Sequence, residues 1–145
     1  MEKIERKSHT ALNKIYFWTA TINKWQPLFH NDLQKQTIIQ SLKTLSDKKL
    51  ITIYGFVIMP NHIHLVWQQN DRNGKENPKG SFMKFTAHEF KKYLKVHGGL
   101  EDYKVSAANK SYEFWQRDSL GIEIWSREVA QQKLDYIPVR PARRA

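Results

Sequence analysis

The sequence has no cysteine, no long apolar run and comparatively few acidic residues. The absence of cysteine among its 145 residues excludes a disulfide framework and any zinc site built on thiolates. No apolar stretch approaches the roughly 20 residues that cross a bilayer, and the opening MEKIERKSHTALNK lacks the apolar segment of a secretory signal. We therefore expect a cytoplasmic protein in which any metal is bound by His, carboxylate or amide groups.

The charge balance is strongly basic. Lys and Arg number 24 against 14 Asp and Glu, a formal net charge of +10, which attracts polyanions. Nucleic acid is the first candidate partner and an anionic membrane surface the second. The membrane is disfavoured because neither terminus shows a basic amphipathic helix with Trp or Leu anchors. An apolar content of 40% is sufficient for a core, and the length favours a single domain over residues 1–145.

Hydrophobic patterning predicts alternating strands and helices. Aromatic and β-branched runs favour strands, and apolar residues spaced by three or four favour helices. The predicted strands are 14–22, 50–60 and 61–69, with one or two short strands in 111–126; the predicted helices lie in 30–49, 81–97 and 126–137. This order predicts an α+β fold of the split β-α-β, ferredoxin-like or RRM-like kind, in which helices pack on one face of an antiparallel sheet.

Local details of the helices are also predicted. We expect Asn31 or Asp32 to cap the first helix, Ser126 to cap the third, and residues 70–80 to form a loop. The first helix is expected to bury Leu33, Ile38, Leu42 and Leu45, and the second Met83, Ala87, Phe90 and Leu94.

Two histidines stand one residue apart in the strand-like segment GFVIMPNHIHLVWQQ. Alternate side chains of a strand point to one face, so His62 and His64 are expected side by side. Two neutral imidazoles can bind a divalent cation, which can polarise a phosphoryl oxygen, although further ligands must complete the shell. On spacing alone, histidines that are only hydrogen-bonded or half exposed are the favoured explanation of the pattern.

The segment MPNHIHLVW resembles the histidine–hydrophobic–histidine (HUH) motif of the single-tyrosine transposases, which include the REP-associated tyrosine transposases and relatives of bacterial insertion-sequence transposases. The segments FWTATI, SFMKFTAHEFKKYL, FWQRD and REVAQQKLDYI are similar to segments of this family in the same order. The resemblance implies that His62 and His64 bind Mg²⁺ or Mn²⁺. It also implies that Tyr136, near the C-terminus, is the nucleophile.

The activity implied by the resemblance is metal-dependent cleavage and rejoining of single-stranded or hairpin DNA in the bacterial cytoplasm. Tyr136 would attack a phosphodiester to form a 5′-phosphotyrosine and a free 3′-OH, and reversal on another strand would give DNA transposition. A phenol of pKa about 10 needs nearby metal or cationic groups to act near neutral pH. The family includes homodimers and monomers, and the sequence does not choose between them. Apart from the resemblance, packing at a helix boundary is the favoured explanation of Tyr136.

The C-terminal residues depart from the family pattern. Relatives continue after the tyrosine as YIHxNPV, whereas this chain reads YIPVRPARRA, so we interpret 138–145 as an atypical, truncated tail. A Gln or Asn one turn beyond the tyrosine completes the metal shell in relatives, but Arg140 stands there and has no lone pair to donate. Water, a substrate oxygen or a carboxylate such as Glu123 remain as third ligands. The alternative function is therefore a catalytically decayed nucleic-acid-binding domain of the same fold.

The resemblance also implies phosphate contacts by basic residues, against the simpler interpretation of a solvated helix face. These residues are Lys84, Lys91, Lys92, Arg117 and Arg127. Three tryptophans are candidates either for base stacking or for the core. They are Trp67, Trp115 and Trp125.

Overall fold

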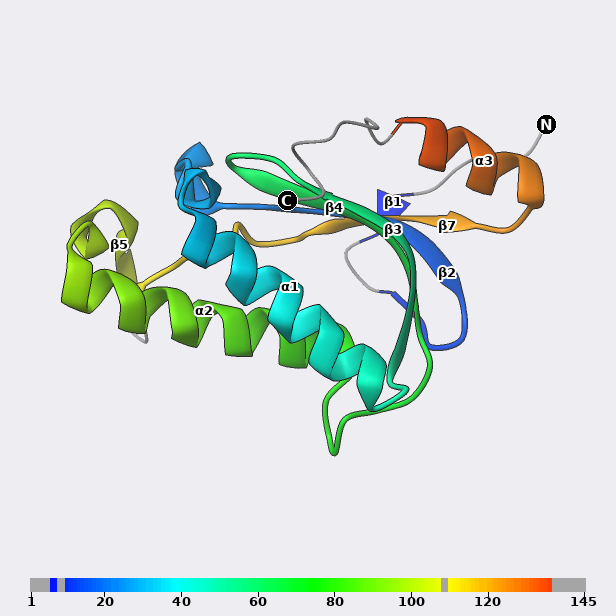
Figure 1. Ribbon diagram of the computed structural model, residues 1–145, viewed down its shortest axis with the longest axis horizontal. Helices are drawn as coiled ribbons and strands as arrows, with labels where there is room; N and C mark the ends of the chain where they lie inside the picture. Colours follow the sequence, from blue (N-terminus) through cyan, green and yellow to red (C-terminus); the bar gives the residue numbers. More distant parts are fainter. Residues whose placement is uncertain (1–5, 8–9, 108–109, 137–145) are drawn as a thin grey trace.

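An antiparallel sheet forms the centre of the protein in a computed structural model, which describes residues 6–7, 10–107 and 110–136. The strand order is β1-β7-β2-β4-β3 (Figure 1). The bounds are β1 Arg6–Lys7, β2 Ile15–Thr21, β3 Ile51–Ile58, β4 His62–Gln69 and β7 Leu120–Ile124, with a separate hairpin of β5 Lys104–Ala107 and β6 Lys110–Tyr112. Because β1 contributes only two residues, the four strands β7-β2-β4-β3 make up most of the sheet.

Three α-helices cover the two faces unequally (Figure 1). Their bounds are α1 Asp32–Asp47, α2 Pro78–His97 and α3 Arg127–Tyr136, and short 3-10 turns occupy Asn23–Trp25, Leu28–His30 and Leu100–Tyr103. The helices α1 and α2 pack side by side on one face, and α3 lies on the other. The order β-α-β-β-α-β confirms the predicted α+β, ferredoxin-like fold. The prediction that the helices pack on one face of the sheet is right for α1 and α2. It is wrong for α3, which packs on the opposite face.

The face beneath α1 and α2 carries the main core, because alternate residues of β2 and β4 point toward those helices. Trp18 and Trp67 are fully buried and their rings stack with centroids 5.1 Å apart. Phe82 of α2 contacts both rings edge-on, at centroid distances of 6.0 and 6.4 Å. Full burial of a large apolar side chain stabilises a fold by about 1.5–3 kcal/mol, so this aromatic cluster fixes α2 against the sheet.

The opposite face has a smaller apolar cluster under α3. It contains one buried residue from each of β2, β3, β4 and β7 together with one buried residue of α3: Phe17, Val57, Val66, Ile124 and Val129. No tryptophan belongs to this cluster among the described residues. The α3 face therefore has a thinner apolar layer than the α1 and α2 face.

The second helix begins earlier than predicted. Asn77 caps it, since its side-chain oxygen accepts a hydrogen bond from the Gly80 N–H at 2.8 Å, and Pro78 occupies the first turn. Proline suits that position because the N–H it lacks would have no helical partner there. The predicted loop 70–80 is therefore wrong at its C-terminal end.

The first helix is capped as predicted, but one of its expected core residues is exposed. The Asn31 Oδ1 accepts a hydrogen bond from the Leu33 N–H at 2.8 Å, which confirms Asn31 as the cap. Ile38 is fully buried, whereas Leu33 is 59% exposed. Five residues at about 100° each place Leu33 far around the helix from Ile38, and the buried position goes to Gln34. The prediction for Leu33 is wrong.

The buried stripe of the second helix includes Phe90 and Leu94 as predicted, but it is shifted by one residue in the N-terminal half of the helix. Phe82 and Thr86 are fully buried, whereas Met83 and Ala87 are only partly buried against the core. Within the described ranges, the structure has no helix with the length and apolarity that crossing a membrane requires.

Candidate metal and nucleophile site

His62 and His64 lie side by side at the start of β4, on the face that carries α3. Their ring centroids are 4.7 Å apart and the rings are nearly perpendicular, at 80°. His64 pairs with Thr19 of β2 and with Val57 of β3, and Val57 belongs to the cluster under α3. The alternation along β4 therefore brings the two imidazoles together on one face at the start of this strand, as predicted from the sequence.

Each histidine ring is oriented by a neutral polar neighbour. The His62 Nδ1 lies 2.7 Å from Asn61 Oδ1, and the His64 Nδ1 lies 2.9 Å from Thr19 Oγ1. An amide oxygen only accepts, so the pairing with Asn61 selects the tautomer of His62 with its proton on Nδ1. The hydroxyl of Thr19 can accept from His64 in the same way. In these tautomers the lone pair of each ring is on Nε2, the arrangement by which histidine binds metals when its other nitrogen is hydrogen-bonded.

Both histidines are uncharged at neutral pH. Burial lowers the pKa of His62 below its usual 6.5. Burial, together with repulsion from His62, lowers the pKa of His64 to about 4. Metal ligation needs the neutral imidazole, so neither ring has to lose a proton before it can bind a cation at pH 7.

The described residues contain no group of three His, Asp or Glu side chains that could hold a metal ion. Glu123 is on the wrong face: its partner in β2 is Tyr16, which belongs to the main core beneath α1 and α2. Its carboxylate instead lies 3.9 Å from the Lys14 ammonium. The hypothesis that Glu123 is the third ligand is therefore wrong, and Arg140 lies outside the described residues.

The C-terminal half of α3 lies over the strands next to the histidines. Leu134 Cδ2 lies 3.1 Å from the point where a Cβ on Gly55 would stand, so this close approach depends on glycine. Gly55 pairs with Val66, which is two residues beyond His64 on β4. Figure 1 shows the C-terminal end of α3 directed toward the turn between β3 and β4. The helix thus ends toward the part of β4 that carries the histidines.

Tyr136 is the last residue of α3, and its side chain lies outside the described part of the structure. The helix begins as predicted, because the Ser126 hydroxyl accepts a hydrogen bond from the Val129 N–H at 3.1 Å. Three residues before Tyr136, the Lys133 ammonium lies 5.6 Å from the centroid of the Phe17 ring. The Phe17 ring in turn stacks on His64 at 5.2 Å. One aromatic ring therefore separates a cation of the tyrosine helix from the histidine pair.

The basic residues expected to contact DNA lie on both sides of the sheet. Lys84, Lys91 and Lys92 belong to α2 on the main-core side, Arg117 lies between β6 and β7, and Arg127 begins α3. Three of them have acidic neighbours. The nitrogen–oxygen distances are 3.0 Å for Lys84 and Glu76, 3.7 Å for Lys92 and Glu89, and 3.9 Å for Arg117 and Glu113. Ion pairs this exposed contribute little stability, so phosphate groups can compete for these cations.

The tryptophans divide between core and surface. Trp67 and Trp115 are buried in the main core, and the Trp115 indole N–H donates to Thr86 Oγ1 at 2.9 Å. They are structural residues, which leaves only Trp125, 49% exposed, for stacking among the three.

Sequence reasoning missed three residues of the site. Asn61 could have been found, because it precedes His62 within the motif. Thr19 and Lys133 could not, since their contacts with His64 and Phe17 depend on strand register and on the placement of α3.

No protein-family model and no curated protein sequence matches the chain. Among solved structures, the chain is similar to the REP-associated tyrosine transposase bound to a REP hairpin. The alignment covers 100% of this chain and 75% of the transposase, with a TM-score of 0.59 and 16% sequence identity. This likeness extends over the whole length that the motif resemblance suggested. The chain has the fold of a REP-associated tyrosine transposase.

Proposed function

We propose that the protein is a metal-dependent transesterase that cleaves and rejoins single-stranded DNA, with hairpin-containing DNA as its preferred substrate. The observation that carries the proposal is the pair of neutral histidines on the sheet face that also bears the C-terminal end of α3. The structurally similar transposase was solved with a hairpin bound, which supports the substrate class. The excess of Lys and Arg over Asp and Glu is consistent with a polyanionic substrate.

The histidine pair fits a divalent metal ion. The two rings are neutral, adjacent and fixed through Nδ1 by Asn61 and Thr19. Imidazole donors suit later transition metals best and Mg²⁺ least, while water and phosphate oxygens suit Mg²⁺ and Mn²⁺. We therefore expect His62 and His64 to hold Mn²⁺ more tightly than Mg²⁺ when no DNA is present. When bound, the metal would polarise a phosphoryl oxygen of the scissile phosphate.

Tyr136 is the proposed nucleophile. Its phenol oxygen forms a bond to the scissile phosphorus, the bond from phosphorus to the 3′-oxygen breaks, and the phenol proton ends on that 3′-oxygen. The products are a 5′-phosphotyrosine and a free 3′-OH, and the reverse reaction with another 3′-OH rejoins the strands. Lys133, on the same helix, places a cation near this face, where positive charge favours the phenolate form of a tyrosine.

The second candidate is a decayed nucleic-acid-binding domain of the same fold. The observation in its favour is that the described residues place no third His, Asp or Glu with the two histidines to complete a metal site. Such a protein would bind DNA through the same surfaces without forming a covalent bond to it.

A covalent-adduct assay separates the two candidates. The protein is incubated with labelled hairpin DNA carrying single-stranded flanks, in Mn²⁺ or in EDTA, and resolved on a denaturing gel. We expect a shifted band that requires Mn²⁺ and is lost in Tyr136→Phe. Tyr54→Phe is the matched control, because Tyr54 is an exposed tyrosine on β3, and its adduct should equal that of the wild type. Binding without any adduct across several hairpins would replace the proposal with the decayed domain.

A further inference from the structure

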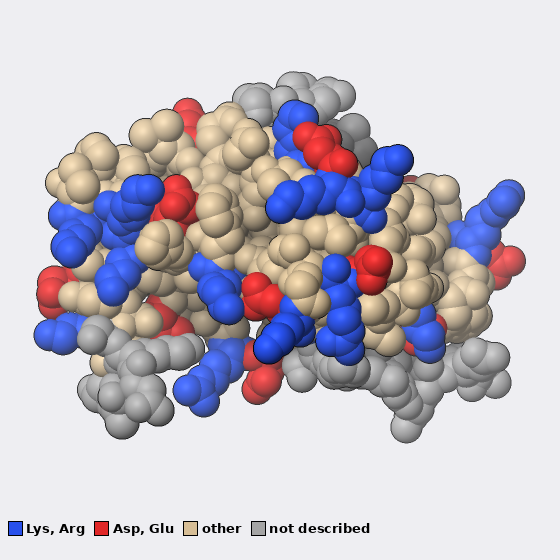
Figure 2. Space-filling model, turned by 90° about the horizontal axis from the view of Figure 1, so that it is seen from below, with Lys and Arg blue, Asp and Glu red and all other residues tan. Residues whose placement is uncertain are grey.

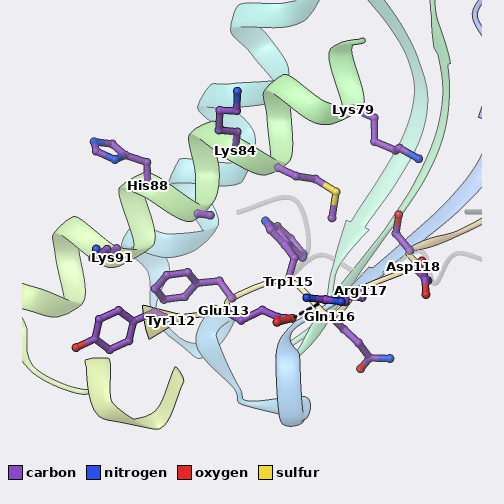
Figure 3. A pocket seen from close by; sticks show the side chains of 14 residues that line it. Lys79, Lys84, His88, Lys91, Tyr112, Glu113, Trp115, Gln116, Arg117 and Asp118 are labelled. Atoms are coloured by element: carbon purple, nitrogen blue, oxygen red, sulfur yellow. Dashed lines mark ion pairs between the residues drawn. The ribbon is translucent and has the colours of Figure 1, made fainter. Parts of the chain in front are cut away.

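A groove of about 820 Å³ lies between α2 and residues 112–119, on the side of the sheet opposite the histidines (Figure 3). Trp115 and Met83 contribute apolar surface to it, and lysines of α2 line one wall. Neither the histidine pair nor α3 contributes to its lining among the described residues. The groove is therefore separate from the candidate metal site.

The groove is positively charged. Its lining includes four cationic side chains, from Lys79, Lys84, Lys91 and Arg117, and two carboxylates, from Glu113 and Asp118, so Lys, Arg, Asp and Glu together give a net of two positive charges. Seen from below, the molecule shows many Lys and Arg side chains with acidic ones interspersed (Figure 2). The Lys84 and Arg117 side chains are 76% and 75% exposed, so both can turn toward a ligand without disturbing the core.

Spacing along α2 leaves room between the two lysines of the wall. Lys84 and Lys91 are seven residues apart, two helical turns, and so lie on one face of the helix about 10 Å apart. Ala87 and His88 line the groove between them, so a methyl group and an imidazole lie between the two ammonium groups. An anionic chain can therefore run along α2 and meet both ammonium groups.

Aromatic groups accompany these charges. The Lys91 ammonium lies 5.4 Å from the centroid of the Tyr112 ring, and Tyr112 is only partly buried. Trp115 is buried in the main core and hydrogen-bonded to Thr86, so it contributes apolar surface to the groove and not a face for stacking. Cationic walls combined with aromatic faces are the features by which proteins bind unpaired nucleic acid, through phosphate attraction and base stacking.

The groove also adjoins the strand next to the histidines. The Gln116 N–H donates to the Thr21 carbonyl at 2.8 Å, and Thr21 pairs with His62 on its other side. Only β2 thus lies between residue 116 and β4. Two strand spacings separate the backbone at residue 116 from the backbone at His62 by about 10 Å. A chain that leaves the groove past Arg117 reaches the histidine face over this end of the sheet.

We propose that this groove binds a single-stranded segment of the DNA substrate and leads it over the sheet end at residues 116–117 toward His62. The inference rests on the proposed function for the identity of the substrate. Binding in the groove, however, needs neither the metal nor Tyr136, so it can be tested apart from the chemistry.

The test compares two triple variants of equal charge. The groove variant is Lys84→Ala, Lys91→Ala and Arg117→Ala; the control is Lys35→Ala, Lys43→Ala and Lys48→Ala on or beside α1. Both sets include lysines that form exposed ion pairs. Fluorescence anisotropy with a fluorescein-labelled mixed-sequence single strand, in EDTA and over a salt series, measures affinity and its salt dependence.

We expect the groove variant to bind about tenfold more weakly at low salt, with the slope of log K against log salt reduced by about 2 for three lost phosphate contacts. The control should stay within about twofold of the wild type. Equal weakening of both triple variants would mean that net charge alone governs binding, and would overturn the inference.

A single substitution tests the same groove in the opposite direction. Asp118 is exposed and has a φ of 58°, a conformation that asparagine also tolerates. Asp118→Asn removes a carboxylate from the lining without changing the backbone requirement, so binding should tighten by about two- to fivefold. Unchanged or weaker binding would contradict the placement of DNA phosphates in the groove.

The adduct assay on the same variants keeps the two proposals distinguishable. Weak binding by the groove variant with no adduct from the wild type would retain the groove and reject the transesterase. An adduct from the wild type with undiminished single-strand binding by the groove variant would retain the transesterase and reject the groove.

Discussion

The two faces of the sheet differ in what covers them. The α1 and α2 face buries two stacked tryptophans and a phenylalanine beneath two long helices. The other face has a small apolar cluster beneath the ten residues of α3, and it carries both candidate metal ligands. The comparison teaches that one face supplies most of the folding free energy, which allows the other to hold polar, partly buried histidines. The following substitutions test this division.

The largest effect is expected in the main core. Trp67→Ala should lower the free energy of unfolding by about 3–5 kcal/mol, because Trp67 is fully buried between Trp18 and Phe82. Trp125→Ala, at a half-exposed position, should stay within about 0.5 kcal/mol of the wild type. Urea unfolding followed by circular dichroism measures both. Similar losses in the two variants would mean that stability is not concentrated on the α1 and α2 face.

The next effect concerns metal binding rather than stability. Thr19→Val removes the hydroxyl that orients His64 and should weaken Mn²⁺ binding about 10- to 100-fold, as measured by titration calorimetry. Thr19→Ser keeps a hydroxyl and should bind Mn²⁺ with the affinity of the wild type. Thr37→Val, which loses an exposed hydroxyl of α1, should not change the affinity. If Thr19→Val binds Mn²⁺ normally, Thr19 does not orient a metal ligand.

A third test concerns the packing of α3 against Gly55 of β3. Gly55→Ala places a methyl group 3.1 Å from Leu134 Cδ2, which should cost about 1–3 kcal/mol and lower the adduct yield by displacing the end of α3. Adding Leu134→Ala removes the clash, so the double variant should lose less stability than the two single changes added together. Strictly additive losses would show that α3 does not rest on Gly55 in solution.

The smallest effects are expected at the helix caps. Ser126→Ala and Asn31→Ala each remove a side-chain acceptor of a helix N-terminus, a change that costs about 1 kcal/mol. Amide exchange should accelerate throughout α3 in Ser126→Ala. In Asn31→Ala it should accelerate only in the first turn of α1, which is longer and better packed. Equal, local acceleration in both would contradict the weaker anchoring of α3.

Local signals explain which features could be predicted from the sequence. The cap residues Asn31 and Ser126 and the shared face of His62 and His64 depend on neighbours within a few residues, and all three predictions are confirmed. The order of strands and helices was sufficient for the α+β fold. Helix starts are harder when a polar loop contains both a cap and a proline, which is why Pro78 was assigned to the loop.

Features that depend on the packing of distant segments could not be predicted. The contact of Thr19 with His64 is set by the register of β2 against β4. Glu123 is excluded as a metal ligand because it pairs with Tyr16, which places its side chain on the face opposite the histidines. The sequence likewise did not determine which side of the sheet α3 covers. The helix sequence shows an apolar stripe, but it does not show the surface against which that stripe packs.

The irregularity in β3 also affects how the protein behaves in concentrated solution. β3 is the outermost strand at one edge of the sheet, and its pairing with β4 shifts register between Ile53 and Gly55. An uninterrupted outer strand offers a straight row of backbone donors and acceptors on which another chain can pair, and a bulge bends that row. The register shift beside Gly55, the residue that Leu134 packs against, therefore protects the protein against edge-to-edge aggregation.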